Sequence, residues 1–432
     1  MTNSDSIPVS DACNSGRRSF LKQTAALTAA GTLAAKAPYV FARNKITLRV
    51  LGTHVTLQEA IRQKAMSDLG IDLVFQPGGE AELIQQATTR PESFDIYEQW
   101  TDSIRQLWQV GSIQPIETDR IVYWDEINTL TKTGKLTDNA RFGLGDAPHK
   151  ILNVQEDGSL GQQFTGKISF LPYVHNVDSF GYNTDVVPTG IPYETESWAW
   201  LLDERWKGKV GIVNAPTIGI FDLALAVEAK GLMQFGDMSD MTVAEIDQLF
   251  EILLQLKRDK HFSGFWNSVP QSVDFITSGR VVIESMFSPG VSSANGLGTP
   301  VIYAAPKEGY RAWHGVMCLS KNCIGHTKDA AYEYMNWWLS GWPGAFIARQ
   351  GYYISNPERS RELLDDTEWG YWYDGKETNQ PLRGTDGRIS VAAGSVRTGG
   401  SYQRRFSNVA IWNTVMNNYD YSLQRWYELL LA

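Results

Sequence analysis

Hydrophobic and polar positions follow two alternating periods along the chain from residue 46 onward. Short apolar segments rich in β-branched residues are typical of strands, and the longer segments between them have apolar positions at helical spacing. In the N-terminal third we expect strands at 46–51, 71–75 and 94–98. A helix is expected after the first strand, through Met66, with Gly70 as its C-terminal cap. Two more helices are expected over 80–88 and 103–110. This alternation predicts an α/β fold with a mostly parallel sheet between helices.

A second α/β series follows an irregular stretch. Residues 136–166 are rich in Gly, Asp, Asn and Gln and predict a loop excursion, and an apolar run then extends from 170 to 183. We expect helices at 197–205, 220–230, 243–258 and 269–278, with strands at 210–213, 281–286 and 301–304. The chain beyond 309 reads as helical and loop-rich. Two series of this length exceed what one hydrophobic core usually holds, so two lobes are expected.

The N-terminal 42 residues have the pattern of an export signal. Arg17-Arg18 precedes Phe20-Leu21-Lys22 and a mildly apolar, alanine-rich stretch from 24 to 35. A charged segment, a short apolar segment and a small-residue end form a signal peptide, and paired arginines indicate the twin-arginine route. We expect cleavage after Ala42, a periplasmic location and the twin-arginine export machinery as a partner. The apolar stretch is too short to span a bilayer.

Charge and composition narrow the class of partner. The formal charge of −9 becomes −11 without residues 1–42, because four basic and two acidic residues lie there. A nucleic-acid partner would require a basic surface, so none is expected. Two cysteines remain beyond the signal, Cys318 and Cys323. They are compatible with a small loop disulfide in an oxidising compartment, or with a buried strand residue and a free turn thiol.

The motifs of common exported enzymes are missing from the sequence. There is no C-x-x-C-H, G-x-G-x-x-G, H-E-x-x-H or G-x-S-x-G, and the six histidines are not paired at metal-ligand spacing. We therefore predict no catalytic residues, no cofactor and no metal site. An exported enzyme built from distant carboxylates stays open as an alternative.

Six segments, in this order, resemble the extracellular solute-binding proteins of ABC importers, in the spermidine/putrescine-binding-like branch. They are Phe94-Asp95-Ile96-Tyr97; Leu171-Pro172-Tyr173 with Gly181-Tyr182-Asn183; Ser197-Trp198 to Trp206-Lys207-Gly208-Lys209; Ser278-Gly279-Arg280-Val281; Ala305-Pro306-Lys307-Glu308-Gly309; and Gly351-Tyr352 to Asn356. The similarity covers most of residues 45–360 and leaves the C-terminal 70 residues unassigned.

The resemblance implies a two-lobed periplasmic-binding-protein fold of type II, with two mixed sheets flanked by helices and hinge strands between the lobes. Residues 43–174 would form the first part of lobe 1, residues 175–309 lobe 2, and 310–432 the return to lobe 1 plus a C-terminal extension. The chain would cross near His175 and return near Trp313. A monomer of this kind closes on a small-molecule solute and delivers it to the transporter permease in the inner membrane.

The resemblance also implies which residues form the ligand site. The loop after the first strand places Thr53 and His54 there, and the loop after the third strand places Trp100 and Asp102. The remaining candidates are His175, Asn214, Thr217, Phe287, Trp313 and Tyr352, with Tyr353 as the alternative to Tyr352. Aromatic faces with a few polar groups suit a polar or cationic organic solute.

The chain departs from the family pattern where polyamine binders have acids. Gly315 stands two residues beyond Trp313, where the family has a carboxylate, so a polyamine needs its charge partner from Asp102 or Asp178. His175, His314 and Asn214 would instead suit hydroxyl or carboxylate groups. A ferric-ion binder using Tyr352-Tyr353 is the nearest alternative, and an orphan chaperone or sensor subunit is a further one.

Overall fold

The computed structural model describes residues 45–432, so the predicted signal peptide with Arg17, Arg18 and its cleavage position lies outside the described residues. The chain alternates strands and helices in its first part, as the sequence predicts. The elements are β1 Thr47–Gly52, α1 Glu59–Leu69, β2 Asp72–Pro77, α2 Glu80–Thr89, β3 Ile96–Trp100, α3 Ile104–Gln109, β4 Ile113–Gln114, β5 Ile116–Glu117 and α4 Thr129–Thr133. Gly70 caps α1 with φ 68°, in the left-handed region that glycine adopts without strain.

The second series also follows the expected order. Its elements are β9 Leu171–Asn183, β10 Val210–Val213, α5 Pro216–Ala229, α6 Val243–Arg258, β11 Phe262–Trp266, α7 Val269–Thr277, β12 Ile283–Met286, α8 Ser288–Gly296 and β13 Val301–Tyr303. The sequence pattern missed β11 and α8. Residues 197–205 form two short 3₁₀ helices instead of one α-helix, because the Asp203 carboxylate accepts from the Arg205 backbone N–H and starts a new turn.

Residues 136–166 are not a plain loop. They contribute β6 Asn153–Val154 and β7 Leu160–Gly161, which combine with β5 and β8 Lys167–Ile168 into a small antiparallel sheet in the order β5-β8-β6-β7. The strands are only two residues long, which explains why no alternation was visible in the sequence.

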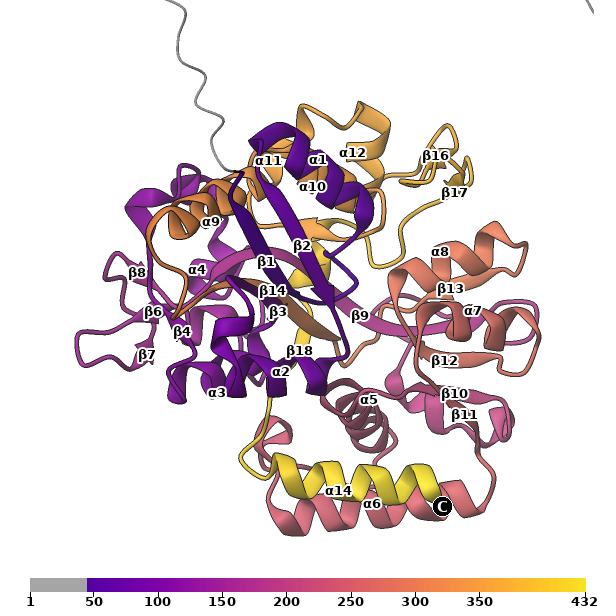
Figure 1. Ribbon diagram of the computed structural model, residues 1–432. Helices are drawn as coiled ribbons and strands as arrows, with labels where there is room; N and C mark the ends of the chain where they lie inside the picture. Colours follow the sequence, from indigo (N-terminus) through magenta and orange to yellow (C-terminus); the bar gives the residue numbers. More distant parts are fainter. Residues whose placement is uncertain (1–44) are drawn as a thin grey trace, which may run out of the picture. The chain divides into compact units, whose positions relative to one another are not determined.

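Within the described residues, twelve strands form one continuous sheet (Figure 1). Eight of them have the order β11-β10-β12-β9-β14-β3-β1-β2. β1 runs parallel to β2 and β3, and β10 runs parallel to β11 and β12. The long central strands β9 and β14 Tyr310–Ser320 are antiparallel to each other, β9 is antiparallel to β12, and β14 is antiparallel to β3 but parallel to β18 Val409–Trp412. The sheet is therefore mixed, as expected, but its two halves share these central strands.

Two large hydrophobic cores lie on either side of the central strands. One surrounds β1, β2 and β3 with α9 Gly325–Trp338, and the other surrounds β10 and β12 with α5 and α6. We call these regions the first lobe and the second lobe. The molecule is thus an α/β protein of two lobes. No helix in residues 45–432 has the length and apolar character that a bilayer crossing needs.

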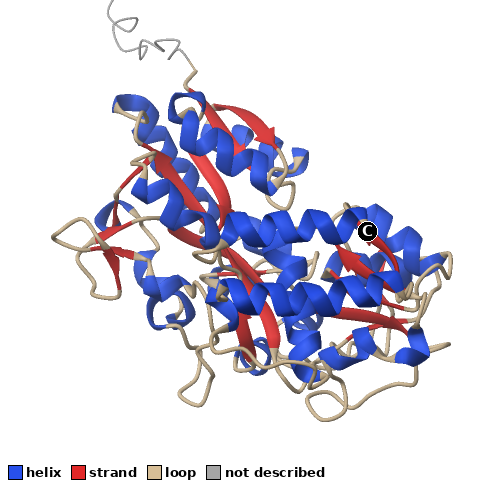
Figure 2. Cartoon of the chain, turned by 90° about the horizontal axis from the view of Figure 1, so that it is seen from below, coloured by secondary structure: helices blue, strands red, loops and turns tan. Residues whose placement is uncertain are grey.

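The chain beyond 309 is the part that the sequence predicted least well. It contains the fully buried strand β14 and then α10 Trp342–Ala348, β15 Tyr353–Ile354, α11 Pro357–Arg361, α12 Asp366–Trp372, β16 Leu382–Arg383, β17 Ile389–Val391, α13 Tyr402–Phe406, β18 Val409–Trp412 and α14 Tyr419–Leu431. β18 pairs with β14, and α14 then packs along α6 of the second lobe (Figures 1 and 2). Trp426 and Leu429 of α14 belong to that lobe's core.

Candidate functional site

An aromatic wall lies at the centre of the sheet where the first lobe meets the central strands. The ring centroids of Trp100 and Trp313 are 4.4 Å apart, and those of Trp313 and Tyr352 are 5.6 Å apart. The register explains the first contact, because Trp100 lies opposite Gly315 and Trp313 precedes Gly315 by two residues. Side chains two residues apart share one face of a strand. The structure therefore brings together Trp100, Trp313 and Tyr352 from distant segments.

Gly315 has a structural role at this wall. A Cβ at this position would lie 2.7 Å from the Val174 carbonyl oxygen, where β9 and β14 shift register. Such an approach is closer than a real Cβ makes, so no side chain fits here without moving the backbone. The missing carboxylate at 315 follows from this close packing of the two central strands.

His175 lies on the opposite face of the sheet from Trp313. It pairs in register with His314, whose ring centroid is 4.7 Å away, whereas Trp313 pairs with Asn176. The His175 Nε2 is 2.7 Å from the Tyr402 hydroxyl oxygen. Burial, and then the neighbouring His314, lower the pKa of His175 well below its usual value. The structure therefore separates this candidate from the aromatic wall.

The candidates in the loop of the first strand are placed unequally. Thr53 is buried, and its hydroxyl accepts from the Val55 backbone N–H at 3.2 Å. His54 is exposed. Only Thr53 of this pair therefore lies in the interior.

The second lobe reaches this region through the N-terminus of α5. The Thr217 hydroxyl donates a short hydrogen bond to the carboxylate of Glu80, the first residue of α2. Asn214 makes its hydrogen bonds to the second lobe and to α14 and not to the first lobe. Its Oδ1 accepts from Trp426 Nε1 at 2.9 Å, and its Nδ2 donates to Asn267 at 2.8 Å. Phe287 packs edge-on against Trp266 at 5.1 Å. Of these candidates, Thr217 contacts the first lobe directly.

Asp102 is a buried acid without a positively charged partner. It lies in the 3₁₀ turn Thr101–Ser103 between β3 and α3, and only 1% of its surface is exposed. Neither of its carboxylate oxygens has a hydrogen-bond partner of regular geometry among the described residues, and the Ser103 backbone and the Thr217 hydroxyl nearby lower its pKa only in part. Desolvation, and then the negative charges of Glu80 and Asp146, raise its pKa well above the usual value. A buried carboxyl in this state is costly unless a partner arrives.

Asn176 has a similar deficit on the same face of the sheet as Trp313. The residue is fully buried, and neither polar atom of its side chain has a partner among the described residues. Buried polar side chains are normally hydrogen-bonded, so each exception calls for a physical reason. An organic solute with hydrogen-bonding groups at this face would supply the missing partners.

A buried charge cluster joins both lobes beside the wall. Arg311 in β14 donates through Nε to Asp222 of α5 at 2.7 Å, through Nη1 to Asn413 at 3.0 Å, and its Nη2 lies 3.5 Å from an oxygen of Asp178. The side chains of Arg311, Asp178 and Asp222 are at most 3% exposed. We call the region formed by the aromatic wall, Asp102, Glu80 and this cluster the crevice, as a name for this set of closely packed side chains where the two lobes meet.

Carboxylates outnumber their positive partners in the crevice. Arg311 pairs with two acids, Asp178 and Asp222. Neither of the other two acids has a cationic partner: Glu80 accepts a hydrogen bond from the Thr217 hydroxyl, and the oxygens of Asp102 are unpartnered. Sequence reasoning missed Glu80, Asp222 and Arg311. The lone acid in the otherwise apolar helix segment 218–227 was the available signal for Asp222, because an unneeded charge inside a buried helix would be destabilising.

The two cysteines and the tyrosine pair can also be placed. Cys318 and Cys323 are both buried and free, the first in β14 and the second in the turn after it. Tyr352 faces Trp313, whereas Tyr353 packs on Tyr402 at 4.4 Å. Among residues 45–432 no group of three or more His, Cys, Asp or Glu side chains is arranged to hold a metal ion.

Comparison with solved structures supports the fold. The TpPotD lipoprotein of Treponema pallidum matches with a TM-score of 0.63 at 10% identity, covering 89% of this chain and 100% of that one. A protein from Listeria monocytogenes described as a spermidine/putrescine ABC transporter matches with a TM-score of 0.62 at 12% identity, covering 89% and 98%. The spermidine/putrescine substrate-binding protein PotD of Streptococcus pneumoniae gives 0.57 at 14%, covering 89% and 100%.

Sequence comparison gives the family. No curated protein matches the chain significantly. The family model described as bacterial extracellular solute-binding protein matches residues 60–362, which span the first lobe, the central strands and the second lobe. The chain therefore belongs to the bacterial extracellular solute-binding proteins.

Proposed function

We propose that this protein is the periplasmic solute-binding component of an ABC importer that takes up a small cationic organic solute. The solute binds in the crevice, and the loaded protein delivers it to the permease in the inner membrane. Export follows the twin-arginine route. The first lobe comprises residues 43–174 and the return from 310, the second comprises 175–309 together with α14 of the C-terminal extension, and β9 and β14 act as the hinge between them.

The observation that carries the proposal is the unpartnered carboxylate of Asp102. An ammonium group placed against it would supply hydrogen bonds and the opposite charge, which removes the cost of the buried acid. Trp100, two residues before Asp102, and Trp313 in contact with Trp100 offer aromatic faces, which attract cations through their negative ring faces. In this chain the negative charge for the solute comes from Asp102, in the turn after β3, and not from position 315, two residues beyond Trp313, where the family has a carboxylate.

The alternative of a ferric site finds less support in the geometry. Tyrosinate ligands must converge on one ion, but Tyr352 and Tyr353 face different neighbours on opposite sides of the segment. A solute with several hydrogen-bonding groups also explains the buried, unpartnered amide of Asn176, which an iron ion bound to tyrosines would not.

Thermal-shift measurements with Asp102→Asn test the proposal. The wild-type protein is screened against putrescine, spermidine, quaternary amines, neutral polyols and organic acids, since a ligand that binds only the folded state raises the melting temperature. We expect an amine to stabilise the wild type and to bind the variant at least about tenfold more weakly, because a charged hydrogen bond is lost.

The matched control is Asp125→Asn, the same chemical change at an exposed acid outside the crevice. Its amine response should equal that of the wild type. An amine response that survives Asp102→Asn, or a response limited to neutral polyols or organic acids, would contradict the assignment of a cationic solute.

A further inference from the structure

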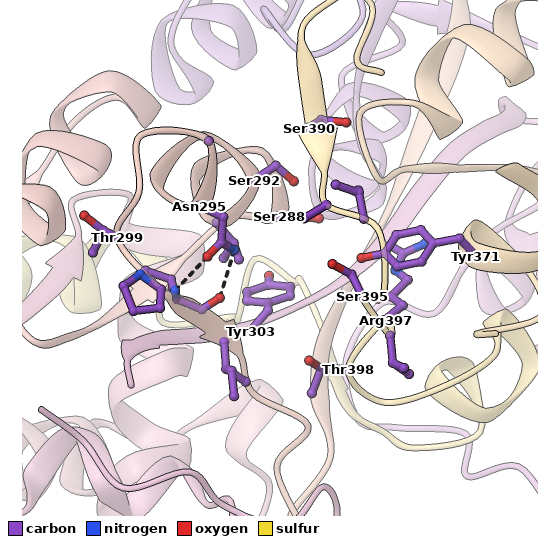
Figure 3. Close-up of a pocket in the computed structure, with 18 of the residues that line it drawn as sticks. Ser288, Ser292, Asn295, Thr299, Tyr303, Tyr371, Ser390, Ser395, Arg397 and Thr398 are labelled. Carbon is purple, nitrogen blue, oxygen red and sulfur yellow. Dashed lines mark hydrogen bonds between the residues drawn. The ribbon is translucent and has the colours of Figure 1, made fainter. Parts of the chain in front are cut away.

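A half-open pocket lies between the second lobe and the C-terminal segment, and it adjoins the crevice at Tyr303, whose hydroxyl donates to Asp178 at 3.1 Å. This lateral cavity has a volume of about 630 Å³. On one side it is lined by Ser288, Ser292 and Asn295 of α8 and by Tyr303 of β13, and on the other by Tyr371 and Arg397 (Figure 3). None of the ten ligand residues expected from the sequence lines it. Its volume falls in the range of small-molecule sites, about 300–1,000 Å³.

Two buried guanidinium groups form the wall on the side of the C-terminal segment. Arg397 is 6% exposed and donates to the Trp372 carbonyl oxygen at 2.9 Å and to that of Gly351 at 2.7 Å. Arg405 is 1% exposed and donates to the Thr398 carbonyl oxygen at 2.7 Å. The Nε of Arg405 is buried and has no partner in the described part of the chain.

These arginines contact aromatic rings and carbonyl groups instead of acids. The guanidinium carbon of Arg397 lies 4.7 Å from the ring centroid of Tyr353, and that of Arg405 lies 5.1 Å from the ring centroid of Tyr310. No carboxylate of residues 45–432 forms a salt bridge with either arginine. Burial lowers the pKa of Arg397, and the positive charge of Arg405 lowers it further while Tyr353 opposes the shift. The pKa of Arg405 is raised instead, because the surrounding tyrosines, Tyr310 first, outweigh the effect of its burial.

Rings and carbonyl dipoles compensate a buried cation only in part. Taking two like charges out of water close to each other is costly unless an opposite charge is present. Arginine forms its strongest contacts with carboxylate and phosphate groups, which accept two parallel hydrogen bonds. The serine and threonine side chains that line the cavity can hold the polar remainder of such a molecule, whereas the Asn295 amide is bonded to the Val301 backbone.

We propose that the lateral cavity binds a small organic oxyanion, a molecule carrying a carboxylate or phosphate group, with Arg397 and Arg405 as its charge partners. The site has other lining residues than the crevice, which it adjoins through Tyr303 and Asp178, and it is opposite to the crevice in charge preference. Its walls come from the second lobe and from a segment that Arg397 ties to Gly351 beside β15. The oxyanion therefore contacts both the second lobe and the C-terminal segment.

The test is a thermal-shift series on the full chain with succinate, citrate and glycerol phosphate as probes, against chloride at matched ionic strength. At a hundredfold excess over its Kd, a bound probe raises the melting temperature by at least about 2 °C. Arg397→Gln should weaken the responding probe at least about tenfold. A response to the carboxylates alone or to the phosphate ester alone supports the proposal and identifies the group that is recognised.

Two serine variants keep the proposal testable if the arginine variant does not fold. Ser292→Phe fills the cavity from α8 without touching either arginine, whereas Ser293→Phe makes the same change at the next, exposed position, outside the cavity lining. The probe response should be lost in the first and kept in the second. It should also persist in Asp102→Asn, which separates this site from the crevice. An equal response in wild type and Ser292→Phe, or no response to any probe, would overturn the proposal.

Discussion

The crevice and the lateral cavity have opposite defects in buried charge. In the crevice the acids Asp102 and Glu80 lack a positive partner, whereas in the lateral cavity Arg397 and Arg405 lack a carboxylate. Arg311, also in the crevice, is paired with both Asp178 and Asp222. The contrast teaches that burial alone does not identify a ligand site. A buried charged group without an oppositely charged protein partner indicates a ligand site, whereas a buried charged group that is fully paired does not.

The largest effect expected from this comparison concerns Arg311. Arg311→Met leaves Asp178 and Asp222 buried without a counter-charge, so the free energy of unfolding should fall by about 3–5 kcal/mol. Arg397→Met removes a guanidinium whose partners are carbonyl oxygens and leaves no acid behind. It should cost about 1–3 kcal/mol. Urea unfolding of both variants measures the difference.

Equal losses in the two arginine variants would break the comparison. They would mean that Arg397 is compensated as well as Arg311 is, through its carbonyl and aromatic contacts. The lateral cavity would then need no anion to balance its charge.

An intermediate effect is expected at the C-terminal helix. Trp426 of α14 donates to Asn214 at 2.9 Å and packs against Gly219, so it holds the loop that precedes α5. Trp426→Phe keeps most of the packing but removes the donor, at a cost of about 1–2 kcal/mol. Because this loop borders the crevice, amine binding should weaken while the response to oxyanions stays unchanged. Calorimetric titration with both probes measures the two affinities, and a parallel loss of both would show that the regions are not independent.

The effect of Asp102 on stability is smallest in acid and depends on pH, because a buried carboxyl can avoid its charge by keeping a proton. Its pKa is raised in the folded state, so the folded protein holds this proton more tightly than the unfolded chain does. Its contribution is therefore present at low pH and is lost as the pH rises through the folded pKa. Asp102→Asn should match the wild type in acid and become relatively more stable as the pH increases.

The same titration predicts the sign of the ligand effect. A bound amine favours the ionised carboxylate, so it lowers the pKa of Asp102 and releases a proton. Amine affinity should therefore increase with pH in the wild type and stay flat in Asp102→Asn. A wild-type affinity that does not vary between mildly acidic and mildly alkaline pH would place the amine away from Asp102.

Local patterns predicted much of the fold but little of its centre. Val210–Val213 and Val243–Arg258 form the expected strand and helix, because each has a periodic apolar face that suits one element. Of β14 the sequence suggested only the buried strand position of Cys318, because Arg311, His314 and Gly315 interrupt the apolar run. Those residues are stable inside only because distant segments supply Asp222, His175 and the Val174 backbone.

The sequence by itself determined the alternation of strands and helices, the two-lobed α/β class, and the family resemblance carried by segments such as Leu171-Pro172-Tyr173. Tertiary structure alone decided that Trp100 meets Trp313, that His175 faces the other way, and that Asp102 and Arg397 are left without opposite charges. The reason is that periodicity is a local property of the chain. Strand register and charge pairing depend on residues that are far apart in sequence and meet only when the sheet closes around β9 and β14.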